Sequence, residues 1–233
     1  TLGLHILGIG PGDEVITPPN SFIASTAAIV HLGAKPVFID VLSDQNLDPE
    51  KIESLINSQT KAVMPVHVTG RMCEMDKILE VANNYSIPVI EDAAQAIGSK
   101  YKNRPSGSFG EVGCFSGHPL KNLNAFGDAG YLTTNNEEIA KKVKLLSNHG
   151  LKNRDIVENF GYVSRMDTLQ AAILNYHFKN LGKIINRRRR NASVYIENLD
   201  SKKIKYNSQD SRFYDTYHTF VIQVENRDGL KEY

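Results

Sequence analysis

Short runs of apolar, often β-branched residues alternate with helix-type patterns through the first 150 residues, and this alternation limits the possible folds most. Four of the runs read as strands: Glu14–Thr17, Pro36–Val41, Ala62–His67 and Pro88–Asp92. Helical patterns at residues 48–56 and Met75–Tyr85 lie between the later ones. Strands that are apolar at nearly every position, separated by helices, are typical of a mainly parallel sheet covered on both faces. The sequence therefore predicts an α/β fold.

The rest of the chain predicts a few further elements and a second domain. We expect strands at Val112–Ser116 and Gly130–Thr134 and a helix at Asn136–Ser147. One long helix is expected from Asp167 to about Leu199, opened by a capping box of Ser164 and Asp167. A strand at Thr219–Val224 then begins something new, nine residues before the sequence stops. We therefore expect a large domain over residues 1–200 and the truncated start of a small domain over 201–233.

Composition excludes several classes of protein. Among 233 residues there are 27 Lys and Arg against 26 Asp and Glu, which is unlike a dedicated nucleic-acid binder. The basic run Arg187–Arg190 is expected to be solvated or to contact another subunit. No apolar stretch is long enough to span a membrane, and no signal peptide is recognisable. Two cysteines, Cys73 and Cys114, make no disulfide framework, so a cytoplasmic location is expected.

Some motifs have ordinary structural interpretations. The glycines of Gly8–Asp13 come before a strand, whereas a Rossmann loop follows one, so a turn is expected here. No partner residues at ligand spacing accompany His67, so a structural or pocket-lining histidine is favoured over a metal ligand. Glu91 and Asp92 end a strand, and ligands of open α/β sheets bind beyond such ends. At least one of these acids is therefore a candidate for function.

Lys121 is the candidate with the most specific chemistry. It follows a predicted strand in an apolar, glycine-flanked segment, GCFSGHPLKNLNAFGDAG, although lysines prefer open surface. Burial lowers the pKa of a lysine and makes its amine nucleophilic, which suits a Schiff base. From its residue chemistry alone, Lys121 is equally compatible with a functional and a purely structural role.

Six segments together resemble the DegT/DnrJ/EryC1/StrS family of pyridoxal-phosphate (PLP) sugar aminotransferases. These segments are GIGPGDEVITPPNSFIAS, GAKPVFIDV, VIEDAAQAIGS, GSFGEVGCFSGHPLKNLNAFGDAG, LSNHG and GYVSRMDTLQAAIL. They follow the family's order over essentially the whole chain. The resemblance implies the type I PLP-transferase fold of aspartate aminotransferase, with a mainly parallel sheet of the seven-stranded type covered by helices and the start of a smaller C-terminal α/β domain.

The resemblance also implies roles for particular residues. Lys121 is similar to the lysine that forms the internal aldimine, and Asp92 to the aspartate that pairs with the protonated pyridine nitrogen. Gln95 matches the side chain that reaches the phenolic oxygen of the cofactor. Ser116 matches a hydroxyl that holds the phosphate, and Phe22 an aromatic ring that stacks on the pyridine. No metal is implied.

Three positions depart from the family pattern. Thr1 is similar to a phosphate-binding threonine, but the segment from Thr1 to Gly10 is about one helical turn short, which leaves its role open. Val163 replaces an asparagine that in many members reaches the phosphate of the neighbouring subunit. Gly117 replaces a common aromatic residue, from which we expect a wider pocket or a looser lysine loop.

The implied activity is transamination of a nucleotide-linked keto-sugar to an amino sugar, with L-glutamate as amino donor, by a homodimer. The implied setting is the biosynthesis of amino-deoxysugars for a polysaccharide or a glycosylated metabolite. Two alternatives stay open. One is a non-catalytic or regulatory protein that binds PLP or a nucleotide sugar, and the other is a PLP-dependent sugar dehydratase. Lys121 argues against the dehydratase, because those family members carry histidine at that position.

Overall fold

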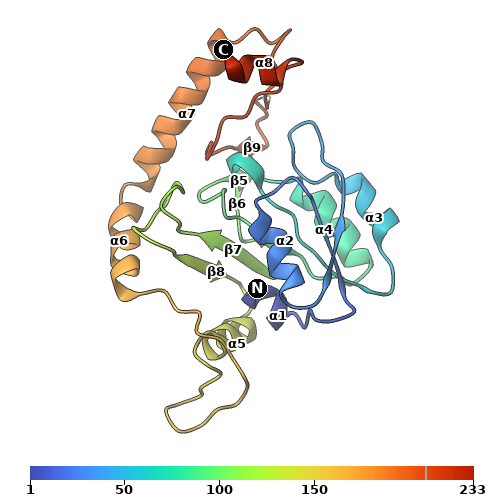
Figure 1. Ribbon diagram of the computed structural model, residues 1–233, viewed down its shortest axis with the longest axis vertical. Helices are drawn as coiled ribbons and strands as arrows, with labels where there is room; N and C mark the ends of the chain where they lie inside the picture. The colour runs from blue at the N-terminus through green and yellow to red at the C-terminus, as the bar shows by residue number, and fades with distance from the viewer. Residues whose placement is uncertain (208) are drawn as a thin grey trace.

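The computed structural model describes residues 1–207 and 209–233. Its helices are α1 (Leu2–Ile6), α2 (Ile23–Val30), α3 (Ile52–Leu55), α4 (Met75–Asn84), α5 (Glu137–Ser147), α6 (Thr168–Phe178), α7 (Leu181–Asn198) and α8 (Arg227–Glu232). Two 3-10 turns, η1 (Pro49–Lys51) and η2 (Val68–Gly70), accompany them. Its strands are β1 (Glu14–Thr17), β2 (Lys35–Phe38), β3 (Thr60–Val63), β4 (Ile90–Asp92), β5 (Lys100–Tyr101), β6 (Arg104–Pro105), β7 (Val112–Ser116), β8 (Gly130–Thr133) and β9 (Phe213–Tyr214). Figure 1 shows their arrangement.

The main sheet is mostly parallel, as the sequence predicts. Strands β2, β1 and β3 are parallel neighbours, and β4 pairs parallel with β7. Parallel bridges from Val63 to Val89 and from Val66 to Asp92 join the two groups. Only β8 runs antiparallel, beside β7. A separate antiparallel sheet has the order β6-β5-β9. The carboxyl ends of the parallel strands therefore share one edge of the sheet.

Both faces of this sheet are covered by apolar side chains. Val15 and Ile16 are neighbours on β1, and both are fully buried. Because side chains alternate across a strand, they belong to different core clusters. Ile16 packs in the cluster that contains Ile78 of α4, whereas Val15 packs with Leu4 of α1. This double coverage explains why the strands read as nearly continuous apolar runs.

The turn before β1 is confirmed as structural. Gly8 and Gly12 have φ angles of 82° and 90°, in the region that favours glycine. The backbone N–H of Gly10 donates to Asp13 Oδ2 at 2.9 Å, which closes the turn before β1 begins at Glu14. The glycines thus shape the chain ahead of the strand rather than following one.

Two predicted elements of the second half are wrong. The expected long helix is divided into α6 and α7 by Lys179 and Asn180, and α6 is capped at Asp167 without a side-chain hydrogen bond, so the capping box with Ser164 does not form. The expected strand Thr219–Val224 is absent from the described residues, where Gln223 makes only an isolated bridge to Lys205. Apart from this bridge, no strand among the described residues pairs with residues 219–224, and a strand needs such a partner to satisfy its backbone.

The arginine run is also different from the expectation. Arg188 donates to the carbonyl oxygens of Tyr217 and His218 at 3.2 and 3.0 Å, and Arg189 donates to that of Asp215 at 2.6 Å. Helix α7 thereby holds the segment that follows β9 against the rest of the molecule. Half of the run binds this chain's own backbone, while Arg187 and Arg190 are exposed. No helix in the described ranges is long and apolar enough to cross a membrane.

Candidate functional site

The predicted site residues gather where two neighbouring parallel strands end. Asp92 ends β4, and it pairs in register with Cys114 of β7. Ser116 ends β7, and Lys121 lies in the loop that follows. This is the edge of an open α/β sheet at which ligands bind. The fold itself therefore brings Asp92, Ser116 and Lys121 together.

The carboxylate of Asp92 is held by two hydrogen bonds. The hydroxyl of Ser25 on α2 donates to Oδ2 at 2.6 Å, and the backbone N–H of Ala94 donates to Oδ1 at 3.1 Å. The side chain is half-buried at the strand end. Both hydrogen bonds fix the direction of the carboxylate, because its two oxygens accept from different donors. Asp92 therefore presents an oriented negative charge.

Lys121 is half-buried, in a loop that its own backbone stabilises. Its backbone N–H donates to the carbonyl oxygen of His118 at 2.8 Å. Burial lowers the pKa of the Lys121 amine, and the negative charge of Asp92 opposes this shift in part. Within residues 1–207 and 209–233, no hydrogen bond or ion pair is formed by Lys121 Nζ. The amine is thus more easily deprotonated than that of an ordinary surface lysine.

Gln95 is oriented by the turn η2. Its Oε1 accepts a hydrogen bond from the backbone N–H of Thr69 at 2.7 Å. A backbone N–H can only donate, so the oxygen of the amide must face Thr69 and its NH2 group must face away. Thr69 has a φ of 64°, which is rare for a residue other than glycine. The unusual backbone of η2 thus fixes Gln95 as a hydrogen-bond donor.

The other three predicted residues lie around this centre. Ser116 accepts a hydrogen bond from the backbone N–H of His118 at 3.3 Å, which leaves its own O–H able to donate. Phe22 immediately precedes α2. Its side chain is 71% exposed, whereas Ser25, three residues later, is buried. Thr1 precedes α1, and its backbone nitrogen lies within electrostatic range of Asp92.

The departures from the family pattern have different structural outcomes. A Cβ at Gly117 would lie 3.0 Å from Ala129 Cβ and 3.3 Å from Leu174, so these side chains already fill the space there. Gly117 also donates to Ala129 and accepts from Ala125, both at 2.7 Å. These contacts describe the space beside Gly117 itself, and the expected wider pocket or looser loop stays a prediction. Val163 is 67% exposed on the segment between α5 and α6.

His67 and Glu91 form a buried structural pair, and neither is exposed at all. The backbone N–H of Cys73 donates to His67 Nδ1 at 3.2 Å, so the proton of the ring sits on Nε2 and is donated to Glu91 at 3.0 Å. Glu91 also accepts the backbone N–H groups of Gly107, Phe109 and Gly110 at 2.7–2.8 Å. The structural interpretation of His67 holds, and of the two acids only Asp92 faces the site.

Sequence reasoning missed three residues near Lys121 and Asp92. Ser25 binds Asp92 directly. Asn122 is buried and donates to the carbonyl oxygen of Thr216 at 3.2 Å. Burial lowers the pKa of His218 to about 4, with the positive charges of Lys121 and Arg188 adding to the shift. None of the three has a distinctive sequence signal, since even Ser25 stands beside a second polar residue, Thr26, in α2.

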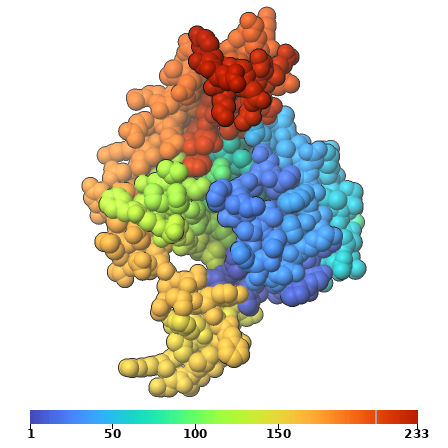
Figure 2. Space-filling view, in the orientation of Figure 1, coloured from blue at the N-terminus to red at the C-terminus, as the bar shows by residue number. Residues whose placement is uncertain are grey.

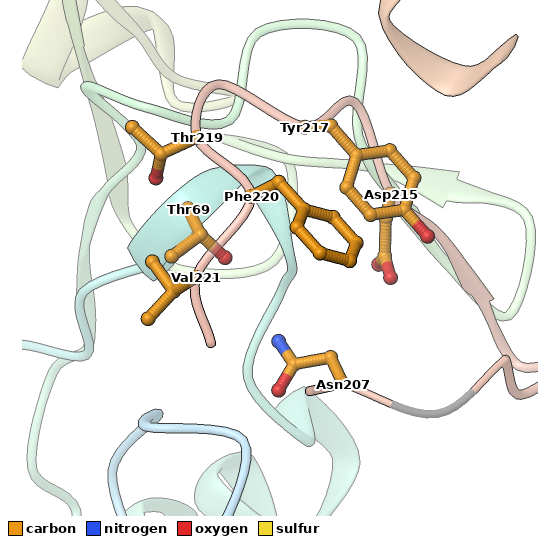
Figure 3. A pocket seen from close by; sticks show the side chains of 7 residues that line it. All are labelled: Thr69, Asn207, Asp215, Tyr217, Thr219, Phe220 and Val221. Atoms are coloured by element: carbon orange, nitrogen blue, oxygen red, sulfur yellow. The ribbon is translucent and has the colours of Figure 1, made fainter. Parts of the chain in front are cut away.

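Two cavities of the described residues have neither Asp92 nor Lys121 in their lining. Figure 3 shows a small one beside Thr69, of about 10 Å³, lined by Thr69, Asn207, Asp215, Tyr217, Thr219, Phe220 and Val221. This volume admits a single water molecule. A larger hollow of about 640 Å³ lies near the amino ends of β1 and β3, with Asp13 and Lys61 in its lining. Across the part of the chain that is described, no cluster of His, Cys, Asp and Glu side chains could hold a metal ion.

Comparison with known proteins identifies the family to which this chain belongs. A family model described as the DegT/DnrJ/EryC1/StrS aminotransferase family matches residues 1–233. The UDP-N-acetyl-3-dehydro-alpha-D-glucosamine 3-aminotransferase of Acidithiobacillus ferrooxidans is 40% identical over 99% of this chain. The chain spans 63% of the length of that relative.

Solved structures give the same result. DesV of S. venezuelae, in complex with a ketimine intermediate, has a TM-score of 0.94 and 37% identity, covering 99% of this chain and 63% of its own. NtdA of Bacillus subtilis, with bound cofactor PMP, has a TM-score of 0.90 and 37% identity, covering 99% of this chain and 53% of its own. The type I PLP-transferase fold is thereby confirmed. The chain belongs to the DegT/DnrJ/EryC1/StrS aminotransferase family.

Proposed function

We propose that this chain is the larger part of a PLP-dependent aminotransferase that converts a nucleotide-linked keto-sugar to an amino sugar, with L-glutamate as amino donor. The observation that carries the proposal is the meeting of Asp92 and Lys121 at one edge of the sheet. Similar proteins named as aminotransferases of UDP-linked sugars support the substrate class. The activity belongs to the synthesis of amino-deoxysugars.

The side chains at this edge fit PLP. Asp92 offers a fixed negative charge for a protonated ring nitrogen, and the NH2 group of Gln95 is turned to donate. Ser116 retains a hydroxyl that can donate to phosphate. The exposed ring of Phe22 stands close to Ser25, the partner of Asp92, and can cover one face of a flat cofactor. The role of Thr1 stays a prediction, since α1 has only five residues.

The chain's own residues then divide the work. PLP, when bound, supplies an electron-poor ring that stores the electrons released when a proton leaves the amino donor. Asp92 keeps the ring nitrogen protonated by holding a negative charge beside it. Lys121 binds the cofactor through Nζ, and the lowered pKa of its amine makes it easier for the same atom to give up and take back a proton.

We further propose a homodimer in the cytoplasm. Exposed apolar side chains on the segment between α5 and α6, Phe160 at 97% and Val163 at 67%, support a protein partner there. Cys73 and Cys114 are both free thiols, in agreement with a reducing compartment. The division into a large domain over residues 1–200 and the start of a small domain over 201–233 also stays a proposal.

Lys121→Arg tests the covalent role. Arginine keeps the positive charge, but its guanidinium stays protonated and cannot bond to the cofactor. We expect Lys121→Arg to abolish transamination and borohydride trapping of PLP, whereas Lys35→Arg, at an exposed lysine that pairs with the buried Glu14, should retain both. Mass spectrometry of the borohydride-treated full-length protein should find the cofactor on Lys121. Finding it on another lysine would refute the assignment.

A substrate screen tests the activity itself. The full-length protein is incubated with L-glutamate and keto-sugars linked to UDP, dTDP or GDP. Formation of 2-oxoglutarate with one of them supports the aminotransferase. A protein that binds PLP yet turns over none of them would favour the regulatory alternative.

A further inference from the structure

Two serines form a hydrogen-bond chain that ends on Asp92. Ser25 Oγ lies 2.6 Å from Asp92 Oδ2, and Ser21 Oγ lies 2.6 Å from Ser25 Oγ. An ionised carboxylate can only accept, so Ser25 must donate its single proton to Asp92. Ser25 Oγ then accepts the proton of Ser21. The direction of both hydrogen bonds follows from the charge of Asp92.

This hydrogen-bond chain lies inside the fold rather than at an open surface. Ser25 is 5% exposed and lies on α2, while Asp92 ends β4, 67 residues later. The backbone N–H of Ser25 donates to the carbonyl oxygen of Phe22 at 3.1 Å, so one short turn carries the proposed stacking ring and the hydroxyl. Buried hydrogen bonds to a charged group are short and strong, as the 2.6 Å distance indicates.

We propose that Ser25 is a positioning residue: oriented by Ser21, it holds the Asp92 carboxylate in place and aimed at the ring nitrogen of the cofactor. This inference rests on the proposed function. Ala94 fixes the other carboxylate oxygen through its backbone, which no side-chain substitution removes. Ser25 is thus the one side-chain contact of Asp92 in the described residues that mutation can delete cleanly.

The physical reason is competition for a proton between Asp92 and the ring nitrogen. A hydrogen bond to the carboxylate stabilises its charged form and leaves the proton on the ring. Without Ser25, the carboxylate would be held less firmly opposite the ring nitrogen, and a bound ring would withdraw fewer electrons from the group at Lys121. The pH at which the visible absorption of the bound cofactor changes would then be higher. Other groups in electrostatic range of Asp92 are Lys121, Cys114, Cys73 and the backbone nitrogen of Thr1, which remain unchanged in the variants.

The test is a pH titration of the visible absorption of the PLP-loaded, full-length protein. For Ser25→Ala we expect the midpoint to rise by about one pH unit, the size expected for one hydrogen bond to a charged group. Ser25→Thr keeps the hydroxyl and should restore the midpoint. Ser106→Ala is the matched control, because it deletes a buried hydroxyl that donates only to the carbonyl oxygen of Ala96.

A second variant covers the case in which Ser25→Ala does not fold. Ser21 is only partly buried, and Ser21→Ala should move the midpoint in the same direction by a smaller amount. Equal midpoints for the wild type, Ser25→Ala and Ser21→Ala would overturn the inference. If the wild type itself shows no visible band and no borohydride trapping, the proposed function fails and the inference fails with it.

Discussion

At the scale of single residues, Asp92 gives the clearest quantitative expectation. Asp92→Ala removes the charge beside the ring nitrogen and should lower kcat/KM by about a thousandfold or more, at 1.36 kcal/mol per factor of ten. The fold should persist, because Asp92 is only half-buried at the end of β4. Steady-state kinetics on the full-length protein measure the effect. Asp40→Ala removes an exposed carboxylate that pairs with Lys51 and serves as the control. Near-normal turnover in Asp92→Ala would show that the assignment is wrong.

The sequence could point to the candidate site residues whose chemistry is local. Lys121 is conspicuous because a lysine stands in an apolar, glycine-flanked segment, and Asp92 because it ends an apolar strand. Ser25 could not be found in this way. Its partner is 67 residues distant, and a serine in a helix is common, so only the packing of α2 against the end of β4 reveals its role. The orientation of Gln95 likewise depends on the backbone of Thr69.

At the scale of elements, Glu91 joins β4 to the loop before β7. Its two oxygens accept four donors, from His67 and three backbone N–H groups. Glu91→Gln keeps the shape but places an NH2 group against two other donors. We expect a loss of about 3 kcal/mol in the free energy of unfolding, measured by chemical denaturation. Glu111→Gln, on an exposed residue, should change little. An equally stable Glu91→Gln would contradict this account.

The same carboxylate predicts an acid sensitivity. Burial raises the pKa of Glu91, but the hydrogen bonds from His67, Gly110 and Gly107 outweigh it, and the net pKa is lowered. A lowered pKa in the folded state stabilises the protein above the pKa of an unfolded glutamate, about 4.3. This stability is lost as the pH falls below that value. Unfolding curves between neutral pH and pH 3 should show the loss, and Glu91→Gln should show less of it.

Element boundaries were predictable where burial alone decides them. Strands β1 and β7 have the predicted bounds, because each is a compact apolar run between turn residues. The division between α6 and α7 was missed, since apolar residues continue at helical spacing and Gly182 lies inside α7 rather than between the two helices. Asn180, a cap-type residue at φ −108° and ψ 1°, is the only local signal. The prediction of a strand at Thr219–Val224 was wrong because an apolar run does not show which strand it would pair with.

At the scale of the whole molecule, exposed apolar side chains occur in several places, and two regions among them lie next to each other in the sequence. The segment between α5 and α6 projects from the body of the molecule, at the bottom of Figure 2. It carries Phe160, 97% exposed, and Val163. Helix α6 exposes Leu169 and Tyr176 at 68% and 66%. A monomer in water rarely presents so many large apolar side chains, and a second copy that covers them is the simplest assembly, because most oligomers are symmetric.

We therefore expect the full-length protein to sediment as a dimer at micromolar concentration. Phe160→Asp places a charge where an apolar contact is expected and should shift the equilibrium toward monomer. Tyr85→Asp, at the end of α4, alters an exposed aromatic residue outside these two regions and should leave the dimer intact. If the interface completes the site, as the family resemblance implies, Phe160→Asp should also weaken PLP binding as the protein is diluted. A PLP-loaded wild-type monomer at micromolar concentration would refute the dimer, because the exposed apolar residues would then have no partner while the site is occupied.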